Sequence, residues 1–190
     1  PGGKTLAMAG DMRDAGLLVA TDLRARRVSL LARTMAAGGA RIVRLARIDV
    51  SRRLPFRPVF DCVLLDAPCS GLGTIRRDPE IRWRRRESDL GELALRQREM
   101  LDRAAEVVRP GGRLVYSTCS SEPEEDEEVV AAFLETHPDY SLRTAAQAAA
   151  AGGPAAAVVN AQGHVRTWPH AHGLEAFFAA ILARDSAASP

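Results

Sequence analysis

The chain has 190 residues, of which 46% are hydrophobic and 26% are charged, and its formal net charge at pH 7 is +2. This is ordinary globular composition, and the length suits one domain, 1–190, with a substantial core. No apolar run reaches the roughly 18 residues of a membrane-spanning helix, so we expect no membrane association. An odd number of cysteines, three, argues against a disulfide framework and favours thiols in a reducing cytoplasm.

The chain opens with a glycine turn, Pro1-Gly2-Gly3-Lys4-Thr5, that leads into a short helical stretch. Such a turn presents backbone N–H groups and a favourable dipole to an anion. A P-loop is the alternative interpretation, but that motif needs a further glycine upstream of Gly2. Because a strand is expected before a turn of this kind, the sequence indicates an N-terminally truncated fragment that lacks its first strand.

Apolar runs and helical stretches then alternate along the chain. We predict strands over 17–21, 41–48, 60–65, 113–117 and 176–182, with helices over 24–37, 90–108 and 123–136. This alternation predicts a doubly wound α/β domain. Asp22 follows the first of these strands, where an acidic residue typically accepts hydrogen bonds from ribose hydroxyls. Capping of the following helix is an alternative role for Asp22.

Two short polar stretches follow predicted strands: Asp66-Ala67-Pro68-Cys69-Ser70-Gly71 and Ser117-Thr118-Cys119-Ser120-Ser121. A parallel α/β sheet places its chemistry at the carboxyl ends of its strands. Two neighbouring strands would therefore bring both thiols and the Asp66 carboxylate to one crevice. Cys62 lies inside its strand and is expected to fill the core.

Charged residues are unevenly distributed. Six arginines surround Trp83 between residues 76 and 86. They belong to the segment 66–86, which is too polar and Gly-rich for a regular element and is predicted to be a long loop. Arginine with an aromatic can bind phosphates and stack a base, whereas the alternative is a solvated loop. The acidic run over 122–128 complements a helix dipole after Pro123, so we assign it no partner.

The C-terminal part of the chain carries little chemistry. Residues 144–159 are rich in alanine and glycine and are predicted to be a loose insertion. His164, His170 and His172 are grouped around Trp168, but their spacing matches no metal-ligand pattern, so we expect no metal.

Taken together, these segments resemble the catalytic domain of the Sun/Fmu-type RNA cytosine-5 methyltransferases. The combination of DAPCSG and STCS in this order is the most specific part of the resemblance. The segments that carry it are PGGKT at 1–5, Asp22, Asp49, DAPCSG at 66–71, RRDPEIRW at 76–83, Gln97 with Met100-Leu101, PGGRLVYSTCSSEPEEDEEVV at 110–130, and the closing histidine-rich segment with AFFAAIL.

The resemblance implies a Rossmann-like fold and S-adenosylmethionine as cofactor. It implies a mostly parallel sheet of order 3-2-1-4-5-7-6 whose strand 7 is antiparallel. It also implies that Asp22 binds the ribose, Asp49 the adenine amino group and Asp66 the methionine ammonium. The methionine end would be held by the opening turn, Pro1, Gly2, Gly3 and Lys4.

The resemblance also implies which thiol attacks. Carbon 5 of cytosine becomes nucleophilic only after a thiolate adds to carbon 6, and the family assigns this step to the STCS cysteine, Cys119. Cys69 would then assist product release, and Asp66 would supply a proton or hydrogen bond at ring nitrogen 3. DNA cytosine methyltransferases instead use the cysteine that follows proline, here Cys69, so the presence of both cysteines favours RNA.

The expected partner is RNA, with small-subunit ribosomal RNA preferred over transfer RNA, and the expected state is a monomer. Arg76, Arg77, Trp83 and Arg84 are the predicted RNA contacts. Three alternatives stay open: a catalytically inert fragment, a DNA cytosine-5 methyltransferase using Cys69, and a redox or metal-binding dithiol protein. The last alternative lacks a CxxC pair.

Overall fold

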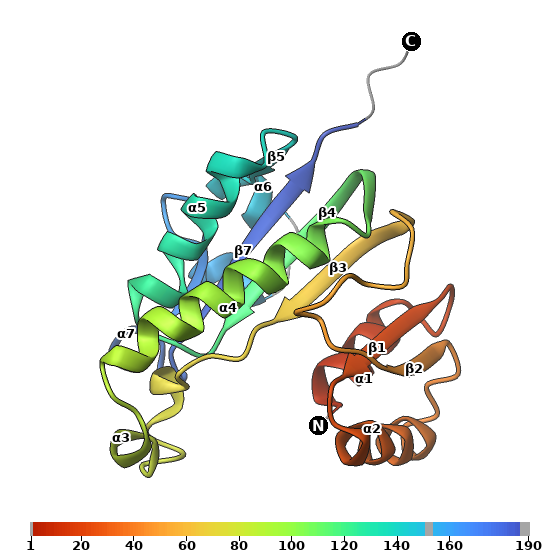
Figure 1. Ribbon diagram of the computed structural model, residues 1–190, viewed down its shortest axis with the longest axis horizontal. Coiled ribbons are helices and arrows are strands. Elements are labelled where there is room, and N and C mark those ends of the chain that lie inside the picture. The colour runs from red at the N-terminus through yellow and green to blue at the C-terminus, as the bar shows by residue number, and fades with distance from the viewer. Residues whose placement is uncertain (1, 151–153, 187–190) are drawn as a thin grey trace. The chain divides into compact units, whose positions relative to one another are not determined.

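The computed structural model describes residues 2–150 and 154–186 and contains two compact units (Figure 1). The N-terminal unit comprises Pro1–Leu54 and the C-terminal unit Pro55–Pro190. The expectation of one domain over the whole chain stays a prediction.

The N-terminal unit contains two parallel strands and two helices. Its elements in chain order are α1 (Gly3–Asp11), β1 (Leu18–Asp22), α2 (Ala25–Ala37) and β2 (Val43–Arg47). Strands β1 and β2 pair in register from Leu18↔Val43 to Asp22↔Arg47. Leu31 and Met35, one helical turn apart on α2, are its buried residues.

The C-terminal unit is built on a mixed sheet of order β3-β4-β7-β5, with β6 also paired to β7. Strands β3 and β4 are parallel, and β7 is antiparallel to β4, as the resemblance predicts for the final strand. Strands β5 and β6 pair with opposite ends of the outer edge of β7. The bounds are β3 (Phe60–Asp66), β4 (Val108–Thr118), β5 (Tyr140–Leu142), β6 (Val165–Thr167) and β7 (Phe177–Arg184).

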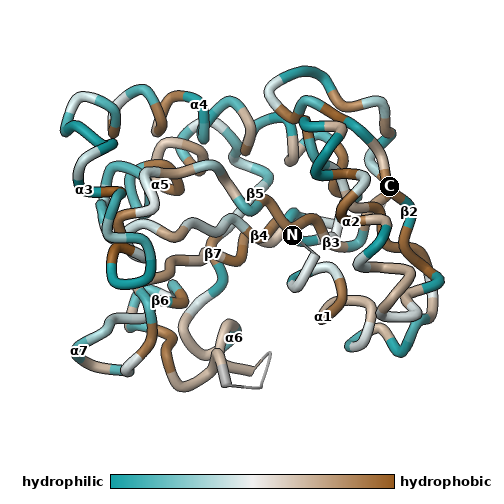
Figure 2. The backbone as a smooth tube through the Cα atoms, turned by 90° about the horizontal axis from the view of Figure 1, so that it is seen from below, coloured by the Kyte–Doolittle hydropathy of each residue, from teal (hydrophilic) through white to brown (hydrophobic). Residues whose placement is uncertain are grey.

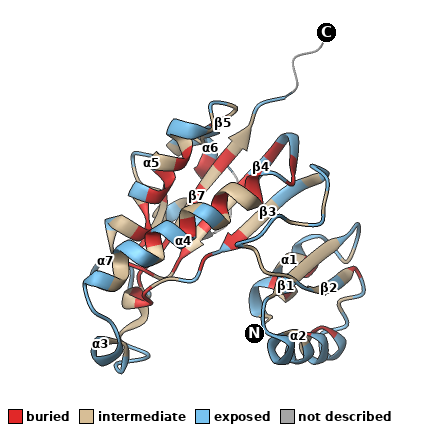
Figure 3. Ribbon diagram, in the orientation of Figure 1, coloured by how far each residue is buried: buried red, intermediate tan, exposed pale blue. Residues whose placement is uncertain are grey.

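Helices α4 (Ser88–Ala105) and α5 (Glu127–Thr136) pack against each other on one face of this sheet (Figure 1). Short helices α3 (Ile81–Arg84), α6 (Ala145–Ala149) and α7 (Pro169–His172) and 3-10 turns at Leu72–Thr74, Pro123–Glu125 and Pro154–Val158 complete the unit. Buried residues concentrate on β4, β7 and the inner sides of α4 and α5 (Figure 3). Leu114 and Leu182, paired across β4 and β7, are both 0% exposed.

Several elements differ from the sequence-based expectation. The predicted helix over 123–136 begins at Glu127, because Pro123–Glu125 forms a separate 3-10 turn. Cys62 is exposed rather than part of the core, since β3 turns that side chain outward beside Arg113. The predicted loose insertion contains α6, whose N-terminus is capped by a capping box between Thr144 and Gln147.

Among the described strands, β1 pairs only with β2 and β3 only with β4. The parallel pair β1-β2 and the run β3-β4-β7-β5 are each consistent with a part of the implied order 3-2-1-4-5-7-6.

Candidate active site

The two cysteine-containing loops leave neighbouring strands at the same edge of the C-terminal sheet. Asp66 at the end of β3 is paired with Ser117 of β4, and the Ala67 amide donates to the Ser117 carbonyl at 2.9 Å. Because of this register, the loops that follow β3 and β4 both begin at the carboxyl ends of the two strands. The Sγ atoms of Cys69 and Cys119 lie 3.1 Å apart, and the Cys119 amide donates to the Cys69 Sγ at 3.3 Å. The structure therefore confirms the prediction from the sequence that the two thiols lie close together.

The environment of Cys69 keeps its thiol protonated. The hydrogen bond with Cys119 raises the pKa of Cys69 well above its ordinary value, and burial and the charge of Cys119 raise it further. When two thiols lie this close, only one of them ionises readily, because two thiolates in contact would repel each other strongly. The pair can thus present one thiolate with a neighbouring S–H.

Asp66 lies at the same edge as the two thiols. Asp66 is exposed, and the Ser117 hydroxyl donates a hydrogen bond to its Oδ1 at 3.3 Å. A carboxyl in this position is accessible to a ligand that enters from the edge of the sheet.

A buried carboxylate, Glu125, lies behind the two loops. It is 0% exposed and accepts hydrogen bonds from Ser70 and Ser120, the residues that follow the two cysteines, and from Gln97 of α4. The sequence-based assignment of this acid to the helix dipole is wrong, because its oxygens bind the two loops instead. Sequence reasoning did not identify Glu125. The available signal was that a serine follows each cysteine, Ser70 after Cys69 and Ser120 after Cys119.

Asp126, the next residue, is also 0% exposed. Its carboxylate accepts hydrogen bonds from the Thr118 hydroxyl and from Arg166 Nη2, the latter at 2.7 Å. Burial raises the pKa of Asp126 to about 7, although the hydrogen bond from Thr118 and the charge of Arg166 act in the opposite direction. Arg166 in turn lies 4.9 Å from the ring centroid of Trp168.

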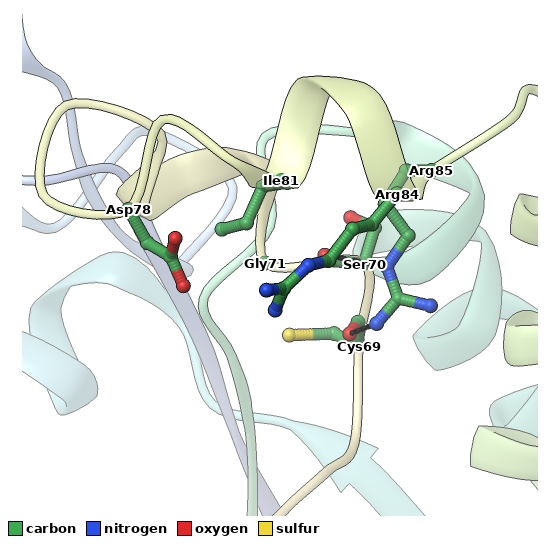
Figure 4. Close-up of a pocket in the computed structure, with 7 residues that line it drawn as sticks. All are labelled: Cys69, Ser70, Gly71, Asp78, Ile81, Arg84 and Arg85. Atoms are coloured by element: carbon green, nitrogen blue, oxygen red, sulfur yellow. Dashed lines mark hydrogen bonds between the residues drawn. The ribbon is translucent and has the colours of Figure 1, made fainter.

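A cavity of about 370 Å³ opens beside Cys69. Figure 4 shows the Cys69 thiol and the Arg84 guanidinium extending in the same direction, toward the side of this space where Asp78 lies. Arg85 points instead to the Cys69 loop, where its Nε donates to the Ser70 carbonyl at 2.9 Å and its Nη2 to the Cys69 carbonyl at 3.3 Å. Arg85 thus ties α3 to the loop that carries Cys69.

The predicted RNA-contacting residues lie on and before α3, in a segment that is largely hydrophilic (Figure 2). Trp83 is 83% exposed, and Arg77 is exposed. Arg84 forms an ion pair with Glu80, and Arg76 Nε lies 3.9 Å from Glu175 Oε1. The structure therefore brings these four residues to one exposed segment near the cavity, with two of the arginines in ion pairs.

The predicted cofactor ligands other than Asp66 belong to the N-terminal unit. Pro1 lies outside the described residues. Gly2 has φ 109°, and a Cβ there would lie 3.0 Å from the side chains of Leu31 and Thr34, so this position needs glycine. Gly3 and Lys4 form the exposed start of α1, and a Cβ on Gly3 would meet open space. The first turn of α1 is thus accessible to an anion.

The two acids of this unit lie at one end of the parallel pair. Asp22 closes β1, Asp49 follows β2, and the Ile48 amide donates to the Asp22 carbonyl at 3.2 Å. Asp22 accepts from the Arg24 amide at 2.8 Å, and Asp49 accepts from the Ser51 hydroxyl at 2.6 Å. Acceptor side chains at this end fit the hydroxyl and amino donors of an adenosine group.

No helix in the described part of the chain is long and apolar enough to cross a membrane. Within residues 2–150 and 154–186, no group of three or more His, Cys, Asp or Glu residues has an arrangement that would hold a metal ion.

Comparisons with known proteins identify the class to which this fold and site belong. A crystal structure of NSun6 from Pyrococcus horikoshii with SFG matches with a TM-score of 0.81 and 29% identity, over 98% of this chain and 46% of that one. A methyltransferase homolog from the same organism matches with a TM-score of 0.77 and 32% identity, over 97% and 58% of the two chains. The fold is that of the S-adenosylmethionine-dependent methyltransferases, which confirms the predicted fold class and cofactor.

The family model described as 16S rRNA methyltransferase RsmB/F matches residues 1–183, and the chain belongs to this family. Ribosomal RNA small subunit methyltransferase F of Escherichia fergusonii is 36% identical over 190 residues, which are 98% of this chain and 39% of the relative. The chain thus spans about two fifths of the length of such relatives.

Proposed function

We propose that this chain is the catalytic part of an RNA methyltransferase that transfers a methyl group from S-adenosylmethionine to carbon 5 of cytosine. The observation that carries the proposal is the 3.1 Å approach of Cys69 and Cys119 at the sheet edge that also bears Asp66. A single thiolate beside a protonated thiol provides the nucleophile and the proton-handling group that this reaction needs.

Cys119 is the proposed nucleophile. Its thiolate adds to carbon 6 of the target cytosine, the carbon 5–6 double bond opens, and carbon 5 becomes an enamine carbon. Cofactor bound to the chain supplies an electrophilic methyl group for carbon 5. The raised pKa of Cys69 accords with this assignment, because it keeps that thiol protonated beside the attacking group.

Cys69 and Asp66 are the proposed proton-handling groups. Addition of a thiolate places negative charge on the pyrimidine, and a protonated or proton-sharing Asp66 at nitrogen 3 would stabilise it. After methylation a base must remove the carbon 5 proton so that the Cys119–carbon 6 bond can break. Cys69, once deprotonated, or a water molecule that it orients, fills this role.

The proposed cofactor contacts keep the roles that the resemblance implies. Gly2, Gly3 and Lys4 would bind the carboxylate of S-adenosylmethionine, Asp22 its ribose, Asp49 its adenine and Asp66 its ammonium group. The accessible first turn of α1 and the acceptors at one end of β1 and β2 support these roles.

Ribosomal RNA of the small subunit is the proposed substrate, in preference to transfer RNA, because the family model and the Escherichia relative are both named for it. Arg76, Arg77, Trp83 and Arg84 would contact the RNA, and the target base would leave its stack to reach the thiols. The chain is proposed to act in the cytoplasm as a monomer.

The proposal is tested by incubating the purified chain with labelled S-adenosylmethionine and transcripts of small-subunit ribosomal RNA, transfer RNA or DNA of matched length. We expect 5-methylcytosine in the ribosomal transcript, mapped by bisulfite sequencing. Methylation of DNA alone would overturn the RNA assignment. A folded chain that binds the cofactor by titration calorimetry but methylates none of the three would overturn the catalytic assignment.

A further inference from the structure

Glu125 is a buried carboxylate whose hydrogen bonds all run toward the two cysteine loops or the helix behind them. Its Oε1 accepts from the Ser70 amide at 2.8 Å and from Gln97 Nε2 at 2.9 Å. Its Oε2 accepts from the Ser70 hydroxyl at 2.5 Å and from the Ser120 hydroxyl at 2.6 Å. One side chain thus binds the residue that follows Cys69 and the residue that follows Cys119.

All four groups that face Glu125 are placed as donors to its carboxyl oxygens. The donors are neutral, so hydrogen bonds rather than an ion pair hold this side chain in its 0% exposed position. Gln97 also donates to the Pro68 carbonyl at 3.0 Å, which links α4 and Glu125 to the residue before Cys69.

We propose that Glu125 is a positioning residue that sets the distance between the Cys69 and Cys119 thiols. It acts through Ser70 and Ser120 and would touch neither the base nor the cofactor. The two serines are themselves tied into their loops, since the Ser70 hydroxyl accepts from the Leu72 amide and the Ser120 hydroxyl from the Glu122 amide. A displacement of the carboxylate would therefore move both loops. The catalytic meaning of this inference rests on the function proposed above.

Glu125→Gln is the informative substitution because it keeps the shape and removes the charge. A glutamine oxygen can still accept from the Ser70 amide and Gln97, but its NH₂ group must then face the two serine hydroxyls as a donor. Both serines would have to exchange donor for acceptor roles, and at least one hydroxyl proton would lose its acceptor. We expect the two loops to separate while the fold is retained.

Equilibration of the two thiols with glutathione measures their relative placement without RNA or cofactor. The thiols are oxidised to a Cys69–Cys119 disulfide while one oxidised glutathione is reduced to two thiols, so the equilibrium constant reports how well the protein holds them together. All proteins carry Cys62→Ser so that the third thiol does not take part. Glu128→Gln, at an exposed site on α5, controls for loss of charge. Val129→Ala, at a buried site on α5, controls for loss of stability.

We expect Glu125→Gln to lower this equilibrium constant at least tenfold, which corresponds to about 30 mV in the potential of the pair. The two control variants should remain within twofold of the parent protein. Ser70→Ala and Ser120→Ala each remove one hydroxyl donor to Glu125, and each should lower the equilibrium constant by part of this amount. These two variants test the proposal even if Glu125→Gln does not fold. Unchanged constants in both serine variants, or an equal decrease in Val129→Ala, would overturn the proposal.

RNA methylation by the same proteins separates this proposal from the proposed function. If the chain methylates RNA, Glu125→Gln should lower kcat and leave the KM for S-adenosylmethionine unchanged. If the parent chain methylates no RNA, the proposed function fails, while the thiol equilibrium still decides whether Glu125 positions the two loops.

Discussion

Cys69 and Cys119 come from loops that follow two parallel strands, and their Sγ atoms lie 3.1 Å apart. At this distance only one of the two thiols can ionise readily, since burial and the neighbouring sulfur hold the proton on Cys69. The pair therefore combines a nucleophile with a proton-carrying partner. This asymmetry leads to opposite expectations for the two cysteines.

Substitution of Cys119 by alanine is expected to abolish both methylation and the covalent RNA adduct, because the sulfur that bonds carbon 6 is gone. Cys69→Ala should retain addition but slow release, so the adduct accumulates. Denaturing gel electrophoresis of protein and labelled RNA measures the adduct. Cys62→Ala, at an exposed site on β3, is the matched control and should behave as the parent chain. An adduct found in Cys119→Ala but not in Cys69→Ala would reverse the assignment of roles.

Arg85 is expected to affect turnover rather than RNA binding, although it belongs to the arginine cluster. Its guanidinium donates to the carbonyls of Cys69 and Ser70, and a lysine ammonium cannot reproduce this planar two-point contact. Arg85→Lys should therefore lower kcat about tenfold, equivalent to about 1.4 kcal/mol, with a smaller change in the KM for RNA. Arg82→Lys, at an exposed site on α3 just before Arg85, is the control. A rise in KM with kcat unchanged would assign Arg85 to RNA binding instead.

Trp83 is expected to contribute to RNA affinity by stacking on a base, since 83% of its surface is exposed next to arginines. Base stacking on an aromatic side chain is worth about 1–3 kcal/mol, so Trp83→Ala should weaken binding by roughly fivefold to a hundredfold. Trp83→Phe should recover much of the affinity. Fluorescence anisotropy with labelled RNA measures the change, and Leu95→Ala, exposed on α4, is the control. Equal affinities for all four proteins would remove Trp83 from the interface.

The strands that carry the thiols could be predicted because their signals are local. Residues 60–65 and 113–117 are apolar runs that end in polar turns, and their parallel pairing then places the following residues at one edge. The three-residue strand β5 could not be predicted in this way. It is formed by pairing with β7, about forty residues away in sequence, and has too few residues to show a period.

The role of Glu125 was also outside the reach of local reasoning. Glu125 and Glu128 belong to one acidic run, yet the first is 0% exposed and the second lies at the surface. Only contacts with distant loops distinguish them. A sequence signal did exist on α4, where Gln97 occupies the same helical face as the buried residues Ala94 and Leu101. A polar residue on an apolar face indicates a buried acceptor nearby.

The raised pKa of Asp126, about 7, predicts how stability depends on pH. Between about pH 4 and pH 7 the folded protein keeps a proton on this carboxyl that the unfolded chain has released, because the ordinary value is 3.8. The free energy of unfolding should therefore fall as pH rises through this range, by at most about 1.4 kcal/mol per pH unit for one proton. Above pH 7 this contribution becomes constant.

Asp126→Asn should remove this dependence, because an asparagine side chain binds no proton and keeps the size of the site. Urea denaturation at pH 5, 6, 7 and 8 measures it, with Glu128→Gln as a control for an exposed acid that should follow the parent chain. Arg166→Leu sharpens the test: loss of the cation 2.7 Å from Asp126 should raise the pKa further and extend the decline in stability beyond pH 7. Parallel pH profiles for the parent chain and Asp126→Asn would mean that Arg166 and Thr118 keep this carboxylate ionised throughout.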